Sequence, residues 1–109
     1  MIARLWSARA SNLQSTHYLE HFWQHVLPTL KKHDGYVSAS VLVRPHQDSV
    51  EILVMSIWQS SQAIDAFAGP DREIAVVDKA AAELLTDYDR RVRHFELAQM
   101  DGVTFRQPS

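Results

Sequence analysis

The chain has 109 residues, the length of one ordinary domain, and 46% of them are hydrophobic. Its formal net charge is −2 at pH 7, so nothing in the composition favours binding to nucleic acid or to an anionic membrane. There is no cysteine, which excludes disulfides, thiolate metal sites and thiol nucleophiles. Because no apolar run is long enough to cross a bilayer and the first residues do not resemble a signal peptide, we expect a cytoplasmic protein.

The first predicted elements are a strand and a long helix. Residues 2–9 alternate as a strand does, and one face carries Ile2, Arg4 and Trp6. Residues 13–31 have a helical period that we expect to be interrupted near Pro28, where proline clashes with the preceding turn. The predicted apolar face of this helix comprises Leu19, Phe22, Trp23, Val26 and Leu30.

Two further strands follow the helix. Gly35 suits a left-handed cap at the end of the helix. Residues 36–44 alternate between an apolar and a more polar face, which is typical of a strand. Residues 50–58 are apolar on both faces, so we expect a central strand that is covered on both sides.

The remaining segment predicts two short helices and a last strand. Ser60 or Ser61 would cap a helix that ends at Ala68, a second helix spans residues 80–85, and residues 88–97 form a strand. The resulting order, βαββαβ, is that of the ferredoxin-like α+β fold, an antiparallel sheet with its helices on one face. We expect this domain to span residues 1–98, followed by a C-terminal tail at 99–109.

The face of the sheet that the helices leave open is predicted to be apolar. We place on it Leu42, Ile52, Val54, Trp58 and Val92, together with the arginines Arg4 and Arg44, while Phe95 faces the helices. A monomer rarely exposes so large an apolar patch, so a second copy of the chain is the expected cover. The sequence leaves open whether the tail exchanges with that copy.

A set of short motifs resembles a known family. It comprises Arg4 with Trp6, Asp34-Gly35, Ser56-Ile57-Trp58, Ala63-Ile64, Phe67-Ala68-Gly69, Ala75-Val76-Val77 and Val92-Arg93-His94-Phe95-Glu96. Together these resemble the antibiotic biosynthesis monooxygenase (ABM) superfamily of dimeric α/β barrels, and in particular an uncharacterised bacterial subgroup. The resemblance spans nearly the whole chain up to Ala98, but this superfamily hosts many unrelated tasks.

The resemblance implies two kinds of chemistry. Some members are cofactor-independent oxygenases that hold an anionic aromatic substrate between helix and sheet while oxygen attacks it. A haem-degrading branch uses a helix histidine as the iron ligand, and counting from Trp58 places the relevant helix positions at Phe67 and Val77. Neither residue ligates iron as histidine does, so we expect no haem and no other cofactor.

The candidate catalytic residue is His94, whose ordinary pKa suits a general base for a phenol or enol. The alternative is a buried structural histidine. Arg4 and Arg44 are candidates for binding a substrate anion, although an ion pair with Glu51 or Glu96 would explain a strand arginine equally well. The candidate aromatic walls are Trp6, Trp58 and Phe67, which core packing would also explain.

Three histidines, His17, His21 and His25, lie four residues apart on one helical stripe. Such spacing permits metal binding, but the stripe is predicted to face solvent, opposite the apolar face, where a closed ligand shell is missing. We therefore predict no metal site there.

Two functions are consistent with these residues and with the family resemblance. The first is a cofactor-independent monooxygenase, or related enolate chemistry, acting on a small aromatic or phenolic metabolite. The second is a non-catalytic homodimer that binds a small ligand or serves in a stress response. Nucleic-acid binding would need exposed aromatic residues on a basic sheet, which this mildly acidic chain does not predict. The sequence does not separate the first two.

Overall fold

The computed structural model describes residues 1–101. The strands are β1 (Ile2–Ser11), β2 (Tyr36–His46), β3 (Ser49–Trp58), β4 (Asp87–Tyr88) and β5 (Arg93–Glu96). The helical elements are α1 (Asn12–His21), the π-helical turn η1 (Phe22–Val26), α2 (Leu27–Lys31), α3 (Ser61–Ala68) and α4 (Lys79–Leu84).

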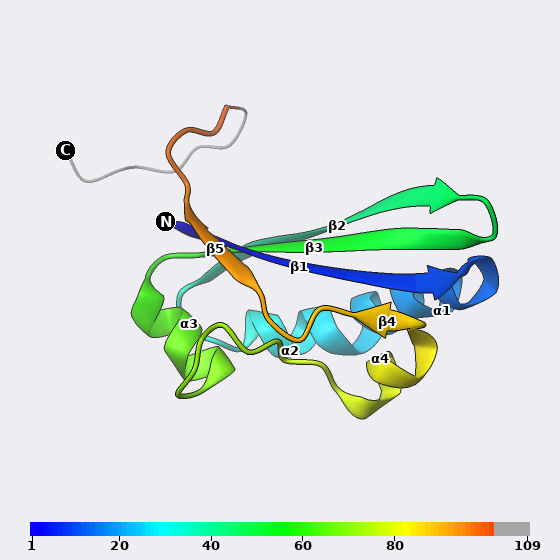
Figure 1. Cartoon of the computed structure of the whole chain (residues 1–109). Helices are drawn as coiled ribbons and strands as arrows, with labels where there is room; N and C mark the ends of the chain where they lie inside the picture. The colour runs from blue at the N-terminus through cyan, green and yellow to red at the C-terminus, as the bar shows by residue number, and fades with distance from the viewer. Residues whose placement is uncertain (102–109) are drawn as a thin grey trace.

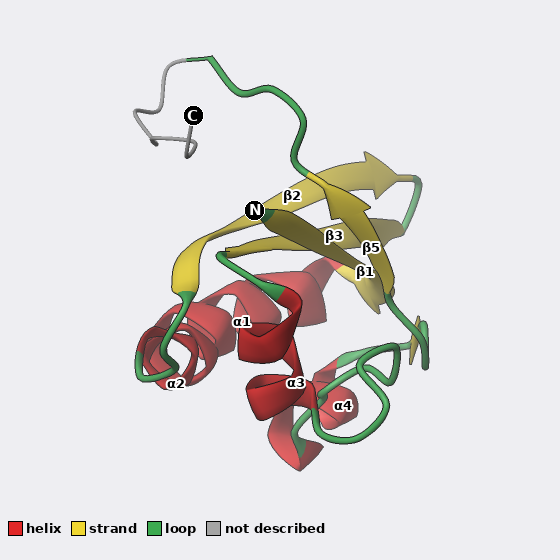
Figure 2. Cartoon of the chain, turned by 90° about the vertical axis from the view of Figure 1, so that its left-hand side faces the viewer, coloured by secondary structure: helices red, strands yellow, loops and turns green. Residues whose placement is uncertain are grey.

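These elements form two layers, a sheet and the helices that cover one of its faces (Figures 1 and 2). The strand order is β2-β3-β1-β4, and all neighbouring strands are antiparallel. Strand β5 pairs with the first residues of β1, along the same edge on which β4 pairs with its last residues. The predicted ferredoxin-like α+β fold is confirmed. The prediction for the last strand is wrong in one respect, because residues 87–96 form two short strands with a break between them rather than one.

The register of β1 corrects our assignment of the two sheet faces. Arg4 lies opposite Ser56 of β3 and His94 of β5, and Trp6 lies opposite Val54. Directly opposed residues share a face, and on this face Trp58 and Ile52 pack against the helices. The side of the sheet that faces the helices therefore carries Arg4, Ile52, Val54, Trp58 and Val92, contrary to the prediction. Of the residues predicted to lie on the open face, only Leu42 and Arg44 lie there.

The long helix changes from α-helical to π-helical hydrogen bonding just before Pro28. The Leu27 N–H donates to the Phe22 carbonyl five residues back, and regular α-helix resumes at Leu27. Proline has no N–H for the carbonyl four residues earlier, which accounts for the predicted interruption.

The buried side of this helix is also different from the predicted one. Tyr18 and Leu27 are buried with Phe22 and Leu30, whereas Leu19 is 38% exposed and Trp23 is 71% exposed. Tyr18 is drawn inward because its ring packs against Trp6 of the sheet and against Phe22. A prediction based on apolar residues alone favours Leu19 over Tyr18, because tyrosine is partly polar. The predicted buried side of the helix was therefore wrong.

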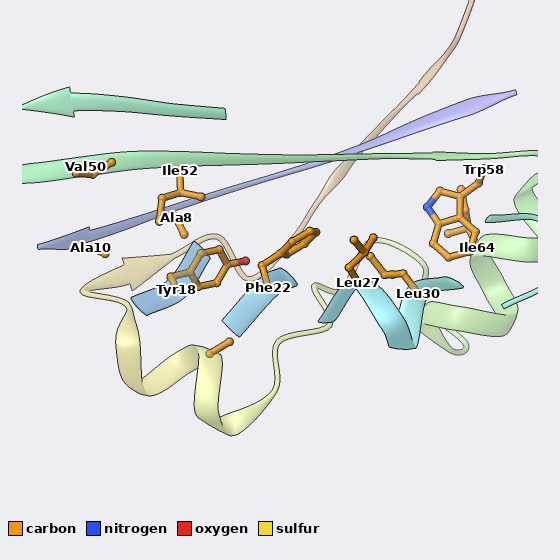
Figure 3. Packing of buried hydrophobic residues seen from close by; sticks show 11 residues of the cluster. Ala8, Ala10, Tyr18, Phe22, Leu27, Leu30, Val50, Ile52, Trp58 and Ile64 are labelled. Carbon is orange, nitrogen blue, oxygen red and sulfur yellow. The ribbon is translucent and has the colours of Figure 1, made fainter. Parts of the chain in front are cut away.

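The core lies between the two layers (Figure 3). Figure 3 shows Tyr18, Phe22, Leu27 and Leu30 rising from the helices toward the sheet residues Ala8, Ile52 and Trp58. Trp58, Ile52 and Ile64 are the largest side chains with almost no exposed surface. This packing fixes the helices over one face of the sheet and leaves room for a site between them.

The opposite face of the sheet carries apolar side chains that no element in residues 1–101 covers. Register places Leu5, Leu42, Leu53, Met55 and Phe95 on this open face. Leu42 is 49% exposed and Phe95, predicted to face the helices, is 47% exposed. None of the helices in residues 1–101 combines the length and the apolar character of a membrane-spanning helix. The predicted tail, residues 99–109, lies almost entirely outside the described residues.

Gly35 connects the helix layer to the sheet and allows a direct test of the packing. Its φ is +86°, and an added Cβ would lie 2.5 Å from the Ala63 Cβ of α3, whereas Gly69, at φ +91°, has open space around the same position. We expect Gly69→Ala to lower the free energy of unfolding by about 2 kcal/mol, the cost of forcing a side chain onto a backbone at φ +91° and ψ −163° that glycine almost alone adopts. Gly35→Ala should cost about 2 kcal/mol more, because α3 must shift. Urea unfolding of both variants measures this difference, and equal losses would contradict the close approach of Gly35 to α3.

Candidate functional site

A cavity of about 70 Å³ lies between the sheet and the helices. Its sheet side comes from β1, β3 and the residue before β5, and its helix side from α1, η1, α2, α3 and the segment leading into α4. The lining residues are Arg4, Trp6, Tyr18, Phe22, Val26, Leu30, Val54, Ser56, Phe67, Val76, Val77, Asp78, Ala81 and Val92. Most of them are apolar or aromatic, and the polar ones lie at two separate places.

Arg4 is the first of these polar places. The side chain belongs to β1, is only 5% exposed and lines the cavity. Its Nη1 donates to the carbonyl of Arg72, and its Nη2 donates to the carbonyl of Ile74 at 2.9 Å. The guanidinium also lies 5.6 Å from the centre of the Phe67 ring, a cation–π distance. The structure thus places Arg4, a predicted anion-binding residue, in the cavity wall on the helix side of the sheet.

The charge of Arg4 is not neutralised by a carboxylate. None of the ion pairs formed within residues 1–101 includes Arg4, and burial lowers the pKa of its guanidinium to about 10. A buried cation whose partners are neutral carbonyls retains much of its desolvation cost, which an anion beside it would offset. The cavity is therefore electrostatically suited to a negatively charged group at this end.

His94 lies beside Arg4 in the sheet. Its Nε2 is 2.9 Å from Nη1 of Arg4, and since a guanidinium can only donate, Nε2 accepts and the ring proton sits on Nδ1. Burial lowers the pKa of His94, and the nearby positive charges of Arg4 and Arg72 lower it further. His94 is therefore neutral at pH 7. It does not line the cavity itself, and its basic nitrogen is occupied by Arg4.

The aromatic residues divide into walls and core. Trp6 and Phe67 line the cavity, and the Trp6 indole donates to the Asp89 carbonyl at 2.7 Å. Trp58 is fully buried, stacks on Phe67 with ring centres 5.1 Å apart, and is not among the lining residues. Its indole N–H donates to the hydroxyl of Ser56 at 2.9 Å. Trp58 thus supports the wall and orients Ser56 rather than forming the wall.

Ser56 adds a second donor beside Arg4. It is 6% exposed, lines the cavity and lies directly opposite Arg4 in the sheet. Because its oxygen already accepts from Trp58, its own proton is free to point at another acceptor. Arg4 and Ser56 together present N–H and O–H groups to the same end of the cavity.

The second group of polar residues lies at the other end of the cavity, which Tyr18 and Asp78 both line. Asp78 caps α4 by accepting from the Ala81 N–H at 2.7 Å, and it also accepts from Nε2 of His21 at 3.0 Å. The Ala81 and His21 hydrogen bonds outweigh partial burial and lower the pKa of Asp78. Burial, together with the negative charge of Asp78, raises the pKa of Tyr18, so its phenol stays protonated.

The segment between α3 and α4, residues 69–78, forms the outer wall of the cavity. Arg4 holds it through the Arg72 and Ile74 carbonyls, and Val92 N–H donates to the Glu73 carbonyl at 2.8 Å. The side chain of Val76 lines the cavity yet is 53% exposed, so this wall is one residue thick.

Two predicted groups of residues lie away from the cavity. Arg44 is on the open face of the sheet, with a 79% exposed side chain that pairs with Glu51, so the structure does not bring it to Arg4. The stripe of histidines is not uniformly solvent-facing, since the His21 side chain is 13% exposed and packs against Asp78. Within residues 1–101 no three His, Cys, Asp or Glu side chains converge as metal ligands would.

Sequence reasoning missed Tyr18, Ser56 and Asp78. Asp78 does carry a local signal, because an aspartate directly before an alanine-rich helix is a typical N-cap. Ser56 was visible only as part of a motif, and Tyr18 was hidden by the more apolar residues around it. Nothing local in the sequence indicates that these three residues face one cavity.

Comparison with known proteins gives one family and several similar folds. The family model described as "Antibiotic biosynthesis monooxygenase" matches residues 1–73. A Bacillus cereus structure named for the same activity is 16% identical, with a TM-score of 0.64, and the match covers 97% of this chain and 98% of that one. No curated protein matches the chain.

Two other similar structures carry ligands. The heme-degrader MhuD from Mycobacterium tuberculosis, with two hemes bound, is 18% identical with a TM-score of 0.59, covering 94% of this chain and 100% of that one. A Streptomyces coelicolor monooxygenase in complex with Nanaomycin D is 14% identical with a TM-score of 0.55, covering 96% and 92%. At these identities the likeness shows the fold alone.

Haem does not fit the cavity of this chain. Within residues 1–101 its lining contains no histidine, cysteine or methionine, and Tyr18, the remaining type of haem axial ligand, is held in its protonated form. Phe67 and Val77, the positions predicted from the haem-degrading branch, are both in the cavity wall and neither ligates iron.

The contact between Arg4 and His94 predicts how His94 titrates. We expect the imidazole of the wild-type protein to titrate below its ordinary pKa of 6.5. Arg4→Met removes the neighbouring charge while keeping the site filled, and should raise the pKa of His94 toward 6.5 without fully restoring it, because burial remains. The Cε1 proton of His94, followed by NMR between pH 4 and 8, measures both. Arg9→Met, a change to an exposed arginine on the opposite face, should leave it unaltered. A wild-type midpoint at or above 6.5 would contradict this description of the pair.

Proposed function

Because this chain belongs to the antibiotic biosynthesis monooxygenase family, we propose that it is a cofactor-independent monooxygenase acting on a small aromatic or phenolic metabolite. The observation that supports this most is the buried guanidinium of Arg4, which lines an aromatic-walled cavity and has no carboxylate partner within residues 1–101. A phenolate fits such a place, since the cation and the Ser56 hydroxyl stabilise the oxygen anion.

The chemistry needs no external reductant. A phenol that carries hydrogen on a ring carbon next to, or opposite, the carbon that bears its hydroxyl reacts with O₂ to give a quinone and water. One oxygen atom becomes the new carbonyl, and the other leaves as water with the hydrogens of the phenol O–H and of the attacked carbon. The substrate supplies all four electrons, and the protein supplies deprotonation, orientation and exclusion of water.

His94 is the proposed base in this scheme. Its lowered pKa keeps it neutral at pH 7 and so able to accept a proton. Its Nε2 accepts from Arg4 in the structure, so a phenol must take over the Arg4 N–H before its own proton reaches His94. After proton transfer, the single negative charge of a phenolate would face the two positive charges of Arg4 and protonated His94, which would stabilise it.

The volume of the cavity restricts the substrate. At about 70 Å³ it is well below the roughly 300 Å³ that a drug-sized ligand needs. We therefore propose a single-ring substrate, or a larger one that displaces the thin wall formed by residues 69–78.

Removing the charge of Arg4 tests this function. We expect Arg4→Gln to lower kcat/KM for oxidation of a turned-over phenol by about 100-fold, the usual cost of losing one preorganised donor to an oxyanion. Oxygen uptake together with quinone absorbance measures turnover. Arg44→Gln, which alters an exposed arginine on the open face, is the matched control and should leave the rate unchanged.

Three results would count against the proposal. Equal loss in both variants would mean that Arg4 has no special role. Unchanged turnover in His94→Ala would remove His94 from the mechanism. Absence of oxygen uptake across single-ring phenols, hydroquinones and catechols would remove the oxygenase function.

A non-catalytic role in binding a small ligand is the second candidate, and one observation favours it. The basic nitrogen of His94 is hydrogen-bonded to Arg4 and does not line the cavity. Under this alternative phenols bind in an Arg4-dependent manner, but oxygen is not consumed.

We also propose that the protein is a homodimer joined through the open face of the sheet. This face carries Leu5, Leu42, Leu53, Met55 and Phe95, and a second copy would bury them as a domain core does. Such burial is the main driving force of an obligate interface.

A charge placed on this face should separate the two copies. We expect the wild-type protein to have twice the chain mass of 12.5 kDa in solution, and Leu42→Lys to shift it toward a single chain. Leu42 is half exposed in one copy, so the substitution should not prevent folding. Light scattering after size exclusion gives the mass. Trp23→Lys, which alters a 71% exposed residue on the helix side, should remain dimeric, and the reverse pattern would place the interface on the helices.

A further inference from the structure

The cavity has two chemically opposite ends. At one end lie the Arg4 guanidinium and the Ser56 hydroxyl, whose oxygen accepts from Trp58 and whose own proton is left for a ligand. At the other end the Asp78 carboxylate lies beside the protonated phenol of Tyr18. A small cavity that presents a cation at one end and an acceptor at the other recognises both the position and the kind of polar groups on its ligand.

Trp6 lies between the two ends of the cavity. Arg4 and Trp6 are successive residues on one face of β1, and such residues are about 7 Å apart. The Tyr18 ring packs against Trp6 at 6.3 Å between centres, and Trp6 thus stands between Arg4 and the Tyr18–Asp78 end. The walls between the ends are apolar, with Val54, Phe67 and Val92 among them.

The Asp78 carboxylate can accept further hydrogen bonds. The carboxylate accepts from the Ala81 N–H and from His21, which leaves lone pairs of its two oxygens unused. The His21 ring also packs against the His25 ring, with ring centres 5.2 Å apart and the planes tilted by 37°. The carboxylate is therefore fixed in position beside the cavity.

We propose that the cavity selects a single-ring phenol that carries a hydrogen-bond donor, a hydroxyl or an ammonium group, on the side of the ring opposite the phenolic oxygen. The phenolic oxygen lies at Arg4 and Ser56, the ring lies along Trp6 and Phe67, and the distal donor reaches Asp78 and Tyr18. This inference rests on the proposed function and names its substrate class.

Three phenols of nearly equal size test it by binding alone. They are 4-ethylphenol, 4-(hydroxymethyl)phenol and 4-(aminomethyl)phenol, which place a methyl, a hydroxyl or an ammonium at the same distal position. We expect at least one of the polar pair to bind the wild-type protein fivefold or more tightly than 4-ethylphenol. The indole N–H signal of Trp6 in a ¹⁵N NMR titration reports the dissociation constants.

Two variants identify the distal partner. Asp78→Asn keeps a good helix cap but removes the charge, and should abolish the advantage of the ammonium compound. Tyr18→Phe removes only the hydroxyl, and should reduce the advantage of the hydroxymethyl compound. Asp87→Asn, in an exposed carboxylate outside the cavity, should leave all three dissociation constants unchanged.

The outcomes separate this inference from the proposed function. If 4-ethylphenol binds as tightly as both polar compounds, or if Asp78→Asn and Tyr18→Phe leave the ratios unchanged, the inference is wrong while Arg4-dependent binding still supports the proposed function. If none of the three compounds binds the wild-type protein but phenol itself does, only the inference is wrong; if phenol does not bind either, the anion site at Arg4 is wrong and both proposals fall. The wild-type ratios decide the first point even if a variant fails to fold.

Discussion

The arrangement of the site depends on one buried cation. Arg4 takes its place on the helix side of the sheet because β1 pairs with β3 and β5 in a register that sets it opposite Ser56 and His94. From there its N–H groups hold the segment that closes the cavity and fix the tautomer of His94. The wall, the neighbouring histidine and the electrostatic character of the cavity all follow from this single side chain.

The helix layer determines what surrounds that cation. The π-helical turn before Pro28 lets one continuous helical segment bury Tyr18 and Phe22 along one part of the sheet and Leu30 along another. Trp58 supports the site from behind, since it stacks on Phe67 and donates to Ser56. Two residues that line the cavity are thus oriented by a neighbour that does not line it, an arrangement expected of a preorganised site.

The fold was predictable from the sequence to a greater extent than the site. Alternation and helical period locate the strands and helices to within a few residues, because they reflect local geometry. The faces of the sheet were assigned wrongly, since β3 is apolar on both sides and its sequence does not say which side the helices cover. Only pairing with β1, a long-range contact, decides that Trp58 faces the helices and Phe95 does not. The same limit explains why Tyr18 and Asp78, 60 residues apart in the chain, were not predicted to meet.

The bonds from Arg4 to the wall bear on how a product would leave if the proposed oxidation takes place. The carbonyls of Arg72 and Ile74 belong to the same chain as the guanidinium, so they are acceptors at a high effective concentration beside it. A phenolate would compete with them through its charge, whereas a neutral quinone would lose that advantage. Conversion of one into the other would therefore shift the competition back toward the carbonyls and favour release of the product.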